Sequence, residues 1–178
     1  GGIDVLVNNA GGAHPGSFQT LEDESLIADF NIKVLSWFRA VKLALPWLRQ
    51  SDAARIVNIG SVYARMPDFR FFSTTVNRAA GQNFTKALAQ ELAADGVLVN
   101  GVNIGCVKTP QWANIHSKRA PEKTAEQFFA DMAEADIPLG RFGEAHEVSG
   151  VVAFLAGARS SYITGASIDV AGGMGRYA

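Results

Sequence analysis

The chain has 178 residues, 48% of them hydrophobic, and its 16 basic and 17 acidic residues leave a formal net charge of −1. This length and composition allow one domain with a sizeable core, and the near-neutral charge gives no sign of binding to nucleic acid or to a membrane surface. The single cysteine excludes an internal disulfide framework and favours a reducing, cytoplasmic location, and no apolar run reaches the roughly 20 residues of a membrane span.

The first expected element is a strand over residues 3–8. It is apolar on both faces apart from Asp4, which is typical of an interior strand of a parallel sheet. The turn that follows, residues 9–12 (NAGG), contains glycines that let a backbone approach a ligand closely. This turn is therefore a candidate binding element.

A long helix is expected over about residues 21–50, because apolar residues recur there every three or four positions. Thr20 is the expected N-cap, and acidic residues follow it in the first turn, where the helix dipole favours them. A break is expected near Asn31, because asparagine has only moderate helix propensity.

The central stretch runs from residue 55 to residue 92 and begins with an apolar, β-branched strand over residues 55–60. Ser61 follows where this strand should end. After a loop, a helix with one apolar face is expected over residues 75–93. A strand, a polar residue at its carboxyl end and a returning helix make half of an α/β crossover, and ligands of open parallel sheets bind at that edge.

Two more strands are expected, over residues 97–103 and 166–170. Thr109 stands directly before Pro110, which favours a helix N-cap at Thr109. Residues 111–137 mix charged and aromatic side chains and predict two short helices. An amphipathic helix is expected over residues 144–156.

The ends of three expected strands indicate one site. Residues 8–11, Ser61 and residues 105–109 each follow a strand directly. Right-handed crossovers bring such ends to one edge of a parallel sheet. The residues alone therefore predict one α/β domain over residues 1–178, with a doubly wound parallel sheet and a ligand cleft at that edge.

The central stretch resembles the active-site segment of short-chain dehydrogenases/reductases, and is most like that of 3-oxoacyl-[acyl-carrier-protein] reductases. That family carries the pattern IVNxSS, a loop, and YxxxK opening a long helix. Ser61 falls on the catalytic serine, but Thr74 stands at the position of the catalytic tyrosine and Arg78 at that of the lysine. The resemblance implies these three as catalytic positions, with Asn31 as the asparagine that turns the helix and holds a water of the proton relay.

The resemblance covers residues 3–173 and implies a Rossmann-type fold of which this chain is the latter part. The first strands and the glycine-rich TGxxxGxG turn are expected to lie before it. NAD or NADP is the implied cofactor, residues 111–137 resemble a substrate lid, and the implied substrate is a small keto or hydroxy compound. The implied cofactor-binding residues are Asn8, Ala10, Gly11, Arg78, Gly105, Val107 and Thr109.

The exchange of tyrosine and lysine at the two catalytic positions weakens the expected chemistry. A phenol with a pKa near 10 can be tuned towards neutrality, whereas the alkoxide of Thr74 costs far more to form. Arg78 keeps a positive charge for ribose hydroxyls, with a different geometry. Tyr63 could act as a substitute phenol or could be only a packed loop aromatic.

Other reactive side chains give weaker signals. His14 and His116 are isolated histidines, and Cys106 fits a small buried residue better than a reactive thiol. The sequence has no metal-ligand spacing, so no metal is expected.

Two functions of different classes remain open. One is an NAD(P)-dependent carbonyl reductase or alcohol dehydrogenase, with hydride transfer between the nicotinamide and a 3-oxoacyl-like substrate and with altered proton delivery. The other is a catalytically silent family member that serves as a cofactor-binding or protein-interaction scaffold.

A homodimer or homotetramer is expected for either function. The family pairs the helices near residues 21–50 and 75–93 with those of a second subunit, and isologous contacts suit a large apolar face. The aromatic residues that enlarge this face are Trp37, Phe38, Trp47, Phe71, Phe72 and Phe84.

Overall fold

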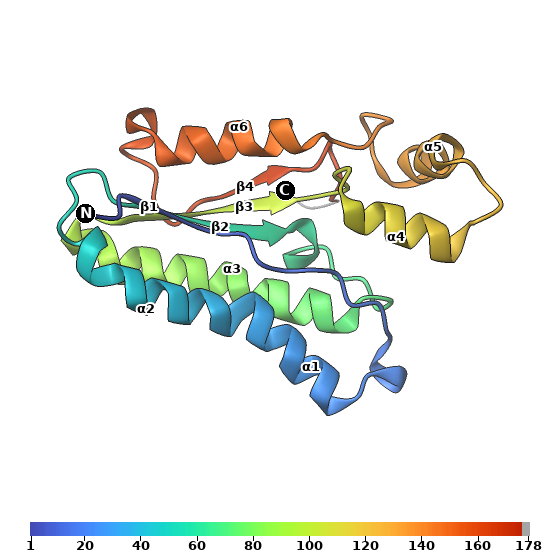
Figure 1. Cartoon of the computed structure of the whole chain (residues 1–178), viewed down its shortest axis with the longest axis horizontal. Coiled ribbons are helices and arrows are strands. Elements are labelled where there is room, and N and C mark those ends of the chain that lie inside the picture. Colours follow the sequence, from blue (N-terminus) through green and yellow to red (C-terminus); the bar gives the residue numbers. More distant parts are fainter. Residues whose placement is uncertain (176–178) are drawn as a thin grey trace.

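A computed structural model describes residues 1–175 and shows a parallel sheet with helices on both faces (Figure 1). The four strands follow the order β1-β2-β3-β4. Every pairing is parallel, with Val5 opposite Arg55 and Arg55 opposite Leu98. The strands are β1 (Val5–Asn8), β2 (Arg55–Ser61), β3 (Leu98–Ile104) and β4 (Ser167–Val170). The predicted α/β class, the strands and their parallel direction are confirmed, with small shifts at the strand ends.

The helices form two layers and one extension. On one face of the sheet lie α1 (Asp23–Phe30), α2 (Ser36–Leu48) and α3 (Phe72–Leu92), and on the other lies α6 (Ala145–Ala156) (Figure 1). Two further helices, α4 (Pro110–Arg119) and α5 (Ala125–Asp136), extend beyond the carboxyl ends of the strands. The two short helices predicted over residues 111–137 are thus confirmed, and they stand at the edge where the strands end.

The core fills both sides of the sheet because successive strand side chains point to opposite faces. Ile56 packs with Leu48 and Leu92 under α2 and α3, whereas its neighbour Val57 packs with Leu155 of α6. Helices α2 and α3 approach each other closely at Gly81, where a Cβ atom would lie 2.9 Å from the ring of Trp37. Trp37 is therefore a core residue, which corrects its assignment to the apolar outer face.

The helix predicted over residues 21–50 is observed as two successive α-helices, α1 and α2, with a break between them. A π-helical turn, Asn31–Leu35, separates α1 from α2, so the break near Asn31 is confirmed. Thr20 is not the N-cap: it ends a 3₁₀ turn, Phe18–Thr20, and Glu22 holds the N-cap position of α1. Thr20 bonds back to Ser17 instead, because a short polar side chain readily closes such a local turn.

Other helix boundaries agree with the sequence. Thr109 holds the N-cap position of α4 with Pro110 in the first turn, although the Thr109 side chain does not cap the helix. The expected amphipathic helix near the C-terminus is α6, with Glu144 as its N-cap. Within residues 1–175, no helix is both long enough and apolar enough to span a bilayer.

Candidate active site

The candidate site lies at the carboxyl ends of β1, β2 and β3. Asn8, Ser61 and Ile104 are the last residues of these three strands, and the parallel register places them at one edge of the sheet. The first turns of α3 pack beneath this edge, against the turn that follows β2. The sheet and α3 therefore bring the predicted segments together.

Thr74 lies in the first turn of α3 and is almost completely buried, with 3% of its surface exposed. Its Oγ1 accepts two hydrogen bonds, each 3.0 Å long. One comes from the backbone N–H of His14 and the other from Nζ of Lys33. Thr74 thus joins the loop after β1 to the helical break before α2.

Lys33 lies in the π-helical turn, and its side chain is 0% exposed. Its ammonium reaches both oxygens of Asp29, at 2.6 Å for Oδ1 and 2.7 Å for Oδ2. The same Asp29 Oδ2 accepts from Ser73 Oγ at 2.7 Å and from Asn77 Nδ2 at 3.0 Å. A completely buried ion pair therefore lies directly behind the Thr74 hydroxyl.

Burial and pairing act in opposite directions on these two groups. Burial alone would raise the pKa of the Asp29 carboxyl, but hydrogen bonds from Lys33, Asn77 and Ser73 outweigh it and hold this pKa below its usual value of 3.8. Burial lowers the pKa of Lys33 from 10.5 to about 8, against the opposing effect of Asp29 and with a further lowering by the charge of Arg78. Asp29 therefore stays ionised at neutral pH. Lys33 loses its proton at a pH only slightly above neutral, because its pKa is about 8.

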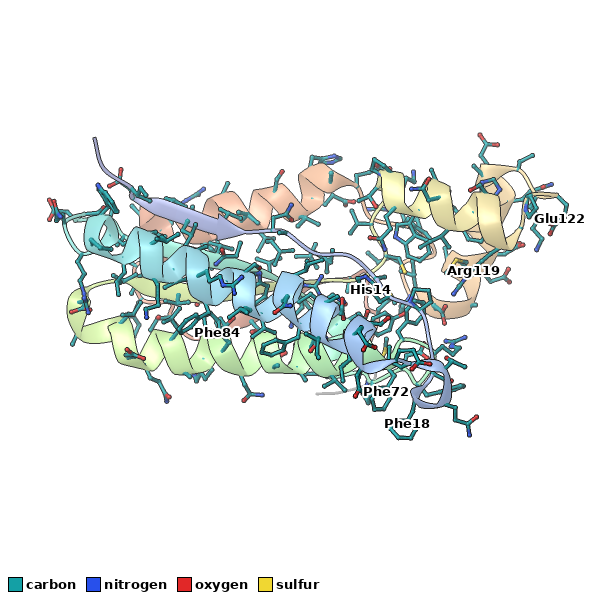
Figure 2. All side chains as sticks on the ribbon, turned by 60° about the horizontal axis from the view of Figure 1, so that its bottom comes forward. His14, Phe18, Phe72, Phe84, Arg119 and Glu122 are labelled. Atoms are coloured by element: carbon teal, nitrogen blue, oxygen red, sulfur yellow. The ribbon has the colours of Figure 1, made fainter. Side chains whose placement is uncertain are left out.

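His14 links this pair to the surface. Its side chain is 45% exposed, and its Nδ1 lies 2.5 Å from Asp29 Oδ1, in a close contact that is not aligned as a hydrogen bond. Figure 2 shows His14 on the loop between β1 and α1. Further along this loop, Phe18 packs edge to face on Phe72, with ring centres 5.5 Å apart, and so holds the loop against α3 (Figure 2).

Asn31 stands at the start of the helical break, and its role in holding a water of the proton relay stays a prediction. Its side chain is exposed, whereas Lys33, two residues further on, is buried and bonded to Thr74. Residues two apart in a helix lie on nearly opposite faces, so Asn31 points away from α3. The helical break is at the expected place, but the side chain that it turns towards the site is that of Lys33.

Arg78 lies one turn after Thr74, almost buried against the loop that follows β1. Its Nη1 donates to the carbonyl oxygen of Ile59 at 2.7 Å, and a Cβ atom on Gly11 would lie 2.8 Å from its Nη2. Its buried Nε has no hydrogen-bond partner within residues 1–175. Burial lowers the pKa of Arg78, but a guanidinium stays charged at any physiological pH.

Ser61 ends β2 and is half-buried. Its Oγ accepts from the backbone N–H of Tyr63 at 3.3 Å, which leaves its own proton available to a ligand. Tyr63 stacks on Phe71, and burial raises the pKa of its phenol to about 12. Burial likewise raises the pKa of the Cys106 thiol to about 12. Both groups therefore stay protonated at neutral pH.

The remaining predicted residues occupy the same edge with different local roles. Asn8 is buried and donates to Asn58 Oδ1 at 2.8 Å, so its amide ties β1 to β2. Ala10 and Gly11 follow on the exposed loop. A Cβ atom on Gly105 would lie 2.8 Å from the Cβ of Ala171. Only glycine therefore fits at position 105 against the glycine-rich segment that follows β4.

Val107 and Thr109 lie on the segment between β3 and α4. Val107 is buried, and the backbone beside it is fixed by bonds from Lys108 N to Gly143 O and from Gly143 N to Cys106 O. Thr109 is exposed at the start of α4. These backbone hydrogen bonds hold the segment in place along the edge of the sheet.

A cavity of about 830 Å³ opens between this edge and the two helices α4 and α5. Its lining mixes aromatic and apolar side chains with three acidic and two basic ones. Lining residues from the segment before α3 and from the two helices are Tyr63, Phe71, Trp112, Arg119, Met132 and Asp136. Arg119 also lies 5.7 Å from the ring centre of Phe71, across the cavity mouth. Of the residues that the structure describes, no three acidic, cysteine or histidine side chains gather as a metal site would require.

The sequence interpretation missed Asp29, Lys33, Ser73 and Asn77. A signal existed: Asp29 and Lys33 stand four residues apart within an otherwise apolar stretch. That spacing is also common for pairs on an exposed helix face. Only the position of α3 shows that this pair is buried.

Comparisons with known proteins agree with the family resemblance seen in the sequence. A family model described as enoyl-(acyl carrier protein) reductase matches residues 1–175. The 3-oxoacyl-[acyl-carrier-protein] reductase FabG of Vibrio cholerae is 33% identical over 98% of this chain and 67% of its own length. The NADPH-dependent reductase BacG of Bacillus subtilis is 30% identical over 97% of this chain and 67% of its own length.

Solved structures agree. L-sorbose reductase from Gluconobacter frateurii, complexed with NADPH and L-sorbose, superposes with a TM-score of 0.95 at 27% identity, over 99% of this chain and 68% of that one. A short chain oxidoreductase from Pseudomonas aeruginosa PAO1, described as containing an atypical catalytic center, superposes with a TM-score of 0.91 at 36% identity, over 98% of this chain and 68% of that one. The chain belongs to the short-chain dehydrogenase/reductase family.

Proposed function

We propose that this protein is a nicotinamide-dependent oxidoreductase that interconverts a small keto compound and its alcohol. The observation that carries the proposal is the position of Ser61, Thr74 and Arg78 at the carboxyl edge of the sheet, on the segments that continue into a substrate-sized cavity through Tyr63 and Phe71. Relatives described as NADPH-dependent support a nicotinamide cofactor, NAD or NADP. A cytoplasmic location belongs to the same proposal.

The residues at the edge fit the ribose and nicotinamide end of such a cofactor. The unpartnered, buried Nε of Arg78 is a donor that a ribose hydroxyl would satisfy, and Gly11, which has no side chain, leaves room for the guanidinium beside it. Asn8, Ala10, Gly105, Val107 and Thr109 would line the rest of this groove. When bound, the cofactor would supply or take up a hydride at the substrate carbon.

The protein's own residues would orient and polarise the substrate. Ser61 keeps a free hydroxyl proton at the end of β2 and can donate it to the carbonyl oxygen. The helices α4 and α5 would form a substrate lid, because their apolar underside faces the cavity. The aromatic and apolar part of the cavity lining suits the chain of an acyl-like keto substrate.

Ser61→Ala in the full-length protein should lower kcat for keto reduction by about 10²–10³, as expected when one donor to a developing oxyanion is lost. Cofactor affinity, measured by the fluorescence of the bound reduced nicotinamide, should not change. Ser149→Ala, on the exposed surface of α6, is the matched control and should leave both values unchanged. A reduced nicotinamide that does not bind to the wild-type protein would contradict the proposal.

The second candidate is a silent scaffold that binds the cofactor without turnover. The observation that favours it is the buried Thr74, since an aliphatic hydroxyl is a poor acid compared with a phenol. Saturable cofactor binding combined with no oxidation of the reduced nicotinamide, for any member of a panel of keto substrates, would select this candidate.

We also propose that the protein forms a homodimer or homotetramer through α2 and α3. Phe38, Leu43 and Trp47 on α2 and Val76 on α3 are large apolar residues that remain exposed. Light scattering of the full-length protein should give at least a dimer, and Leu43→Glu should weaken it, because a charge would be buried at the contact. Phe69→Glu, on the loop before α3, is the control, because Phe69 is exposed to a similar extent as Leu43. A wild-type monomer at micromolar concentration would contradict this assignment.

A further inference from the structure

A buried lysine directly behind a catalytic position requires an explanation beyond stability. Taking an ion pair out of water costs several kcal/mol per ion, and well-packed apolar residues often replace such a pair without loss. Asp29 and Lys33 are nevertheless both fully buried, and their contacts end at the hydroxyl of Thr74.

We propose that Lys33 and Thr74 form the proton-delivery pair of this site, in place of a tyrosine. Thr74 is the catalytic residue that hands its hydroxyl proton to the substrate oxygen, and Lys33 is a positioning residue that replaces this proton through Thr74. The inference rests on the proposed oxidoreductase function and names how that site moves its proton.

The hydrogen-bond directions support a relay. Thr74 Oγ1 accepts from the His14 N–H and from Lys33 Nζ, so both of its acceptor positions are used. Among residues 1–175 nothing accepts a hydrogen bond from the Thr74 hydroxyl. Its own hydrogen is therefore not committed to any residue that the structure describes, and in the proposed relay it goes to a substrate oxygen.

Lys33 Nζ donates hydrogen bonds to Asp29 Oδ2 and to Thr74 Oγ1, and Asp29 Oδ1 lies 2.6 Å away as an ion-pair contact. Of these partners, Thr74 is the neutral one, so transfer towards Thr74 leaves the Asp29 carboxylate ionised.

The step balances without a free alkoxide. In reduction, a bound reduced nicotinamide would supply the hydride to the carbonyl carbon, and the carbonyl oxygen would receive the proton from Thr74 Oγ1. The Lys33 Nζ–H bond breaks as a new Oγ1–H bond forms, which leaves Thr74 as a hydroxyl and Lys33 as a neutral amine. The amine then regains a proton from solvent, and the half-exposed His14 beside Asp29 lies on the route to the surface. Alcohol oxidation is the reverse of these transfers.

The charged groups around Lys33 place its titration near the working pH. Asp29 from α1 faces it directly, Arg78 from α3 acts on it as a like charge, and His14 approaches Asp29 from the loop after β1. Their balance with burial leaves the pKa of Lys33 at about 8, which suits a group that must lose and regain a proton in each cycle.

The test combines a titration with a rate profile on the full-length protein. In protein carrying ¹³C at lysine Cε, the Lys33 signal, assigned with Lys33→Met, should titrate near pH 8 while surface lysines titrate above about 10. The kcat for reduction should fall as pH rises through the same value. Lys33→Met should lower kcat by about 10²–10⁴ and remove that pH dependence.

Two further variants protect the test against misfolding. Thr74→Ser keeps the hydroxyl and should retain the alkaline fall in kcat, whereas Thr74→Val should abolish it without changing cofactor affinity. Lys86→Met, at an exposed lysine of α3 beside Gly165, is the control and should keep the wild-type profile. Wild-type turnover that persists in Lys33→Met with the same pH profile would overturn the relay alone. Cofactor binding without any turnover, with Lys33 still titrating near pH 8, would overturn the proposed function and the relay with it.

Discussion

Asp29→Asn should lower the free energy of unfolding by about 3–5 kcal/mol, because it leaves the buried charge of Lys33 without a counter-ion. This is the largest loss of stability expected from a single substitution that barely changes side-chain volume. Urea denaturation of the wild type and the variant measures the difference. The remaining hydrogen bonds from Ser73 and Asn77 can still reach the amide oxygen, so the loss is caused by the missing charge.

The control is the double variant Asp29→Asn/Lys33→Met. Removing both charges leaves no uncompensated ion, so the double variant should be more stable than the sum of the two single losses predicts, by at least about 1 kcal/mol. Strictly additive losses would show that the pair does not stabilise itself as an ion pair.

The Asp29–Lys33 pair makes the free energy of unfolding depend on pH in both the acidic and the alkaline range. The lowered pKa of Asp29 contributes stability that is present above its usual value of 3.8 and is lost as pH falls below it. Lys33 binds its proton less tightly in the folded chain than in the unfolded chain, where its pKa is 10.5. Between about pH 8 and 10.5 the free energy of unfolding should therefore rise with pH in the wild type relative to Lys33→Met.

The sequence predicted the sheet because its strands carry strong local signals. Each strand contains apolar, β-branched residues, and Asn8, Ser61 and Gly105 stand at or directly after the ends of the first three. The three strand ends therefore located the edge of the site, with Ser61 at its centre. The helical break near Asn31 also followed from local propensity.

The contents of the site could not be predicted in the same way. Lys33 and Thr74 are far apart in the chain, and their contact depends on how the π-helical turn rotates α1 against α3. The family pattern favoured Asn31 at the helical break, whereas the buried side chain that contacts Thr74 from this break is that of Lys33. Burial decides the chemistry of Lys33, and no local window of sequence contains that burial.

The second large effect is kinetic and concerns Lys33 and Thr74 together. Residues that act as one unit show strongly non-additive losses when they are removed singly and together. If Lys33 delivers its proton only through Thr74, then removing either one breaks the same path. Thr74→Val and Lys33→Met should each lower kcat for reduction by about 10²–10⁴, the range typical of positioned acid–base catalysis.

The most direct measurement is the rate of reduced-nicotinamide oxidation in single-turnover experiments on four full-length proteins: the wild type, Thr74→Val, Lys33→Met and the double variant. We expect the two single variants to be slow by similar factors and the double variant to be no slower than the slower of them, with cofactor affinity unchanged throughout. A Thr74→Val protein that retains the wild-type rate, or losses that multiply in the double variant, would contradict proton delivery by the Lys33–Thr74 pair.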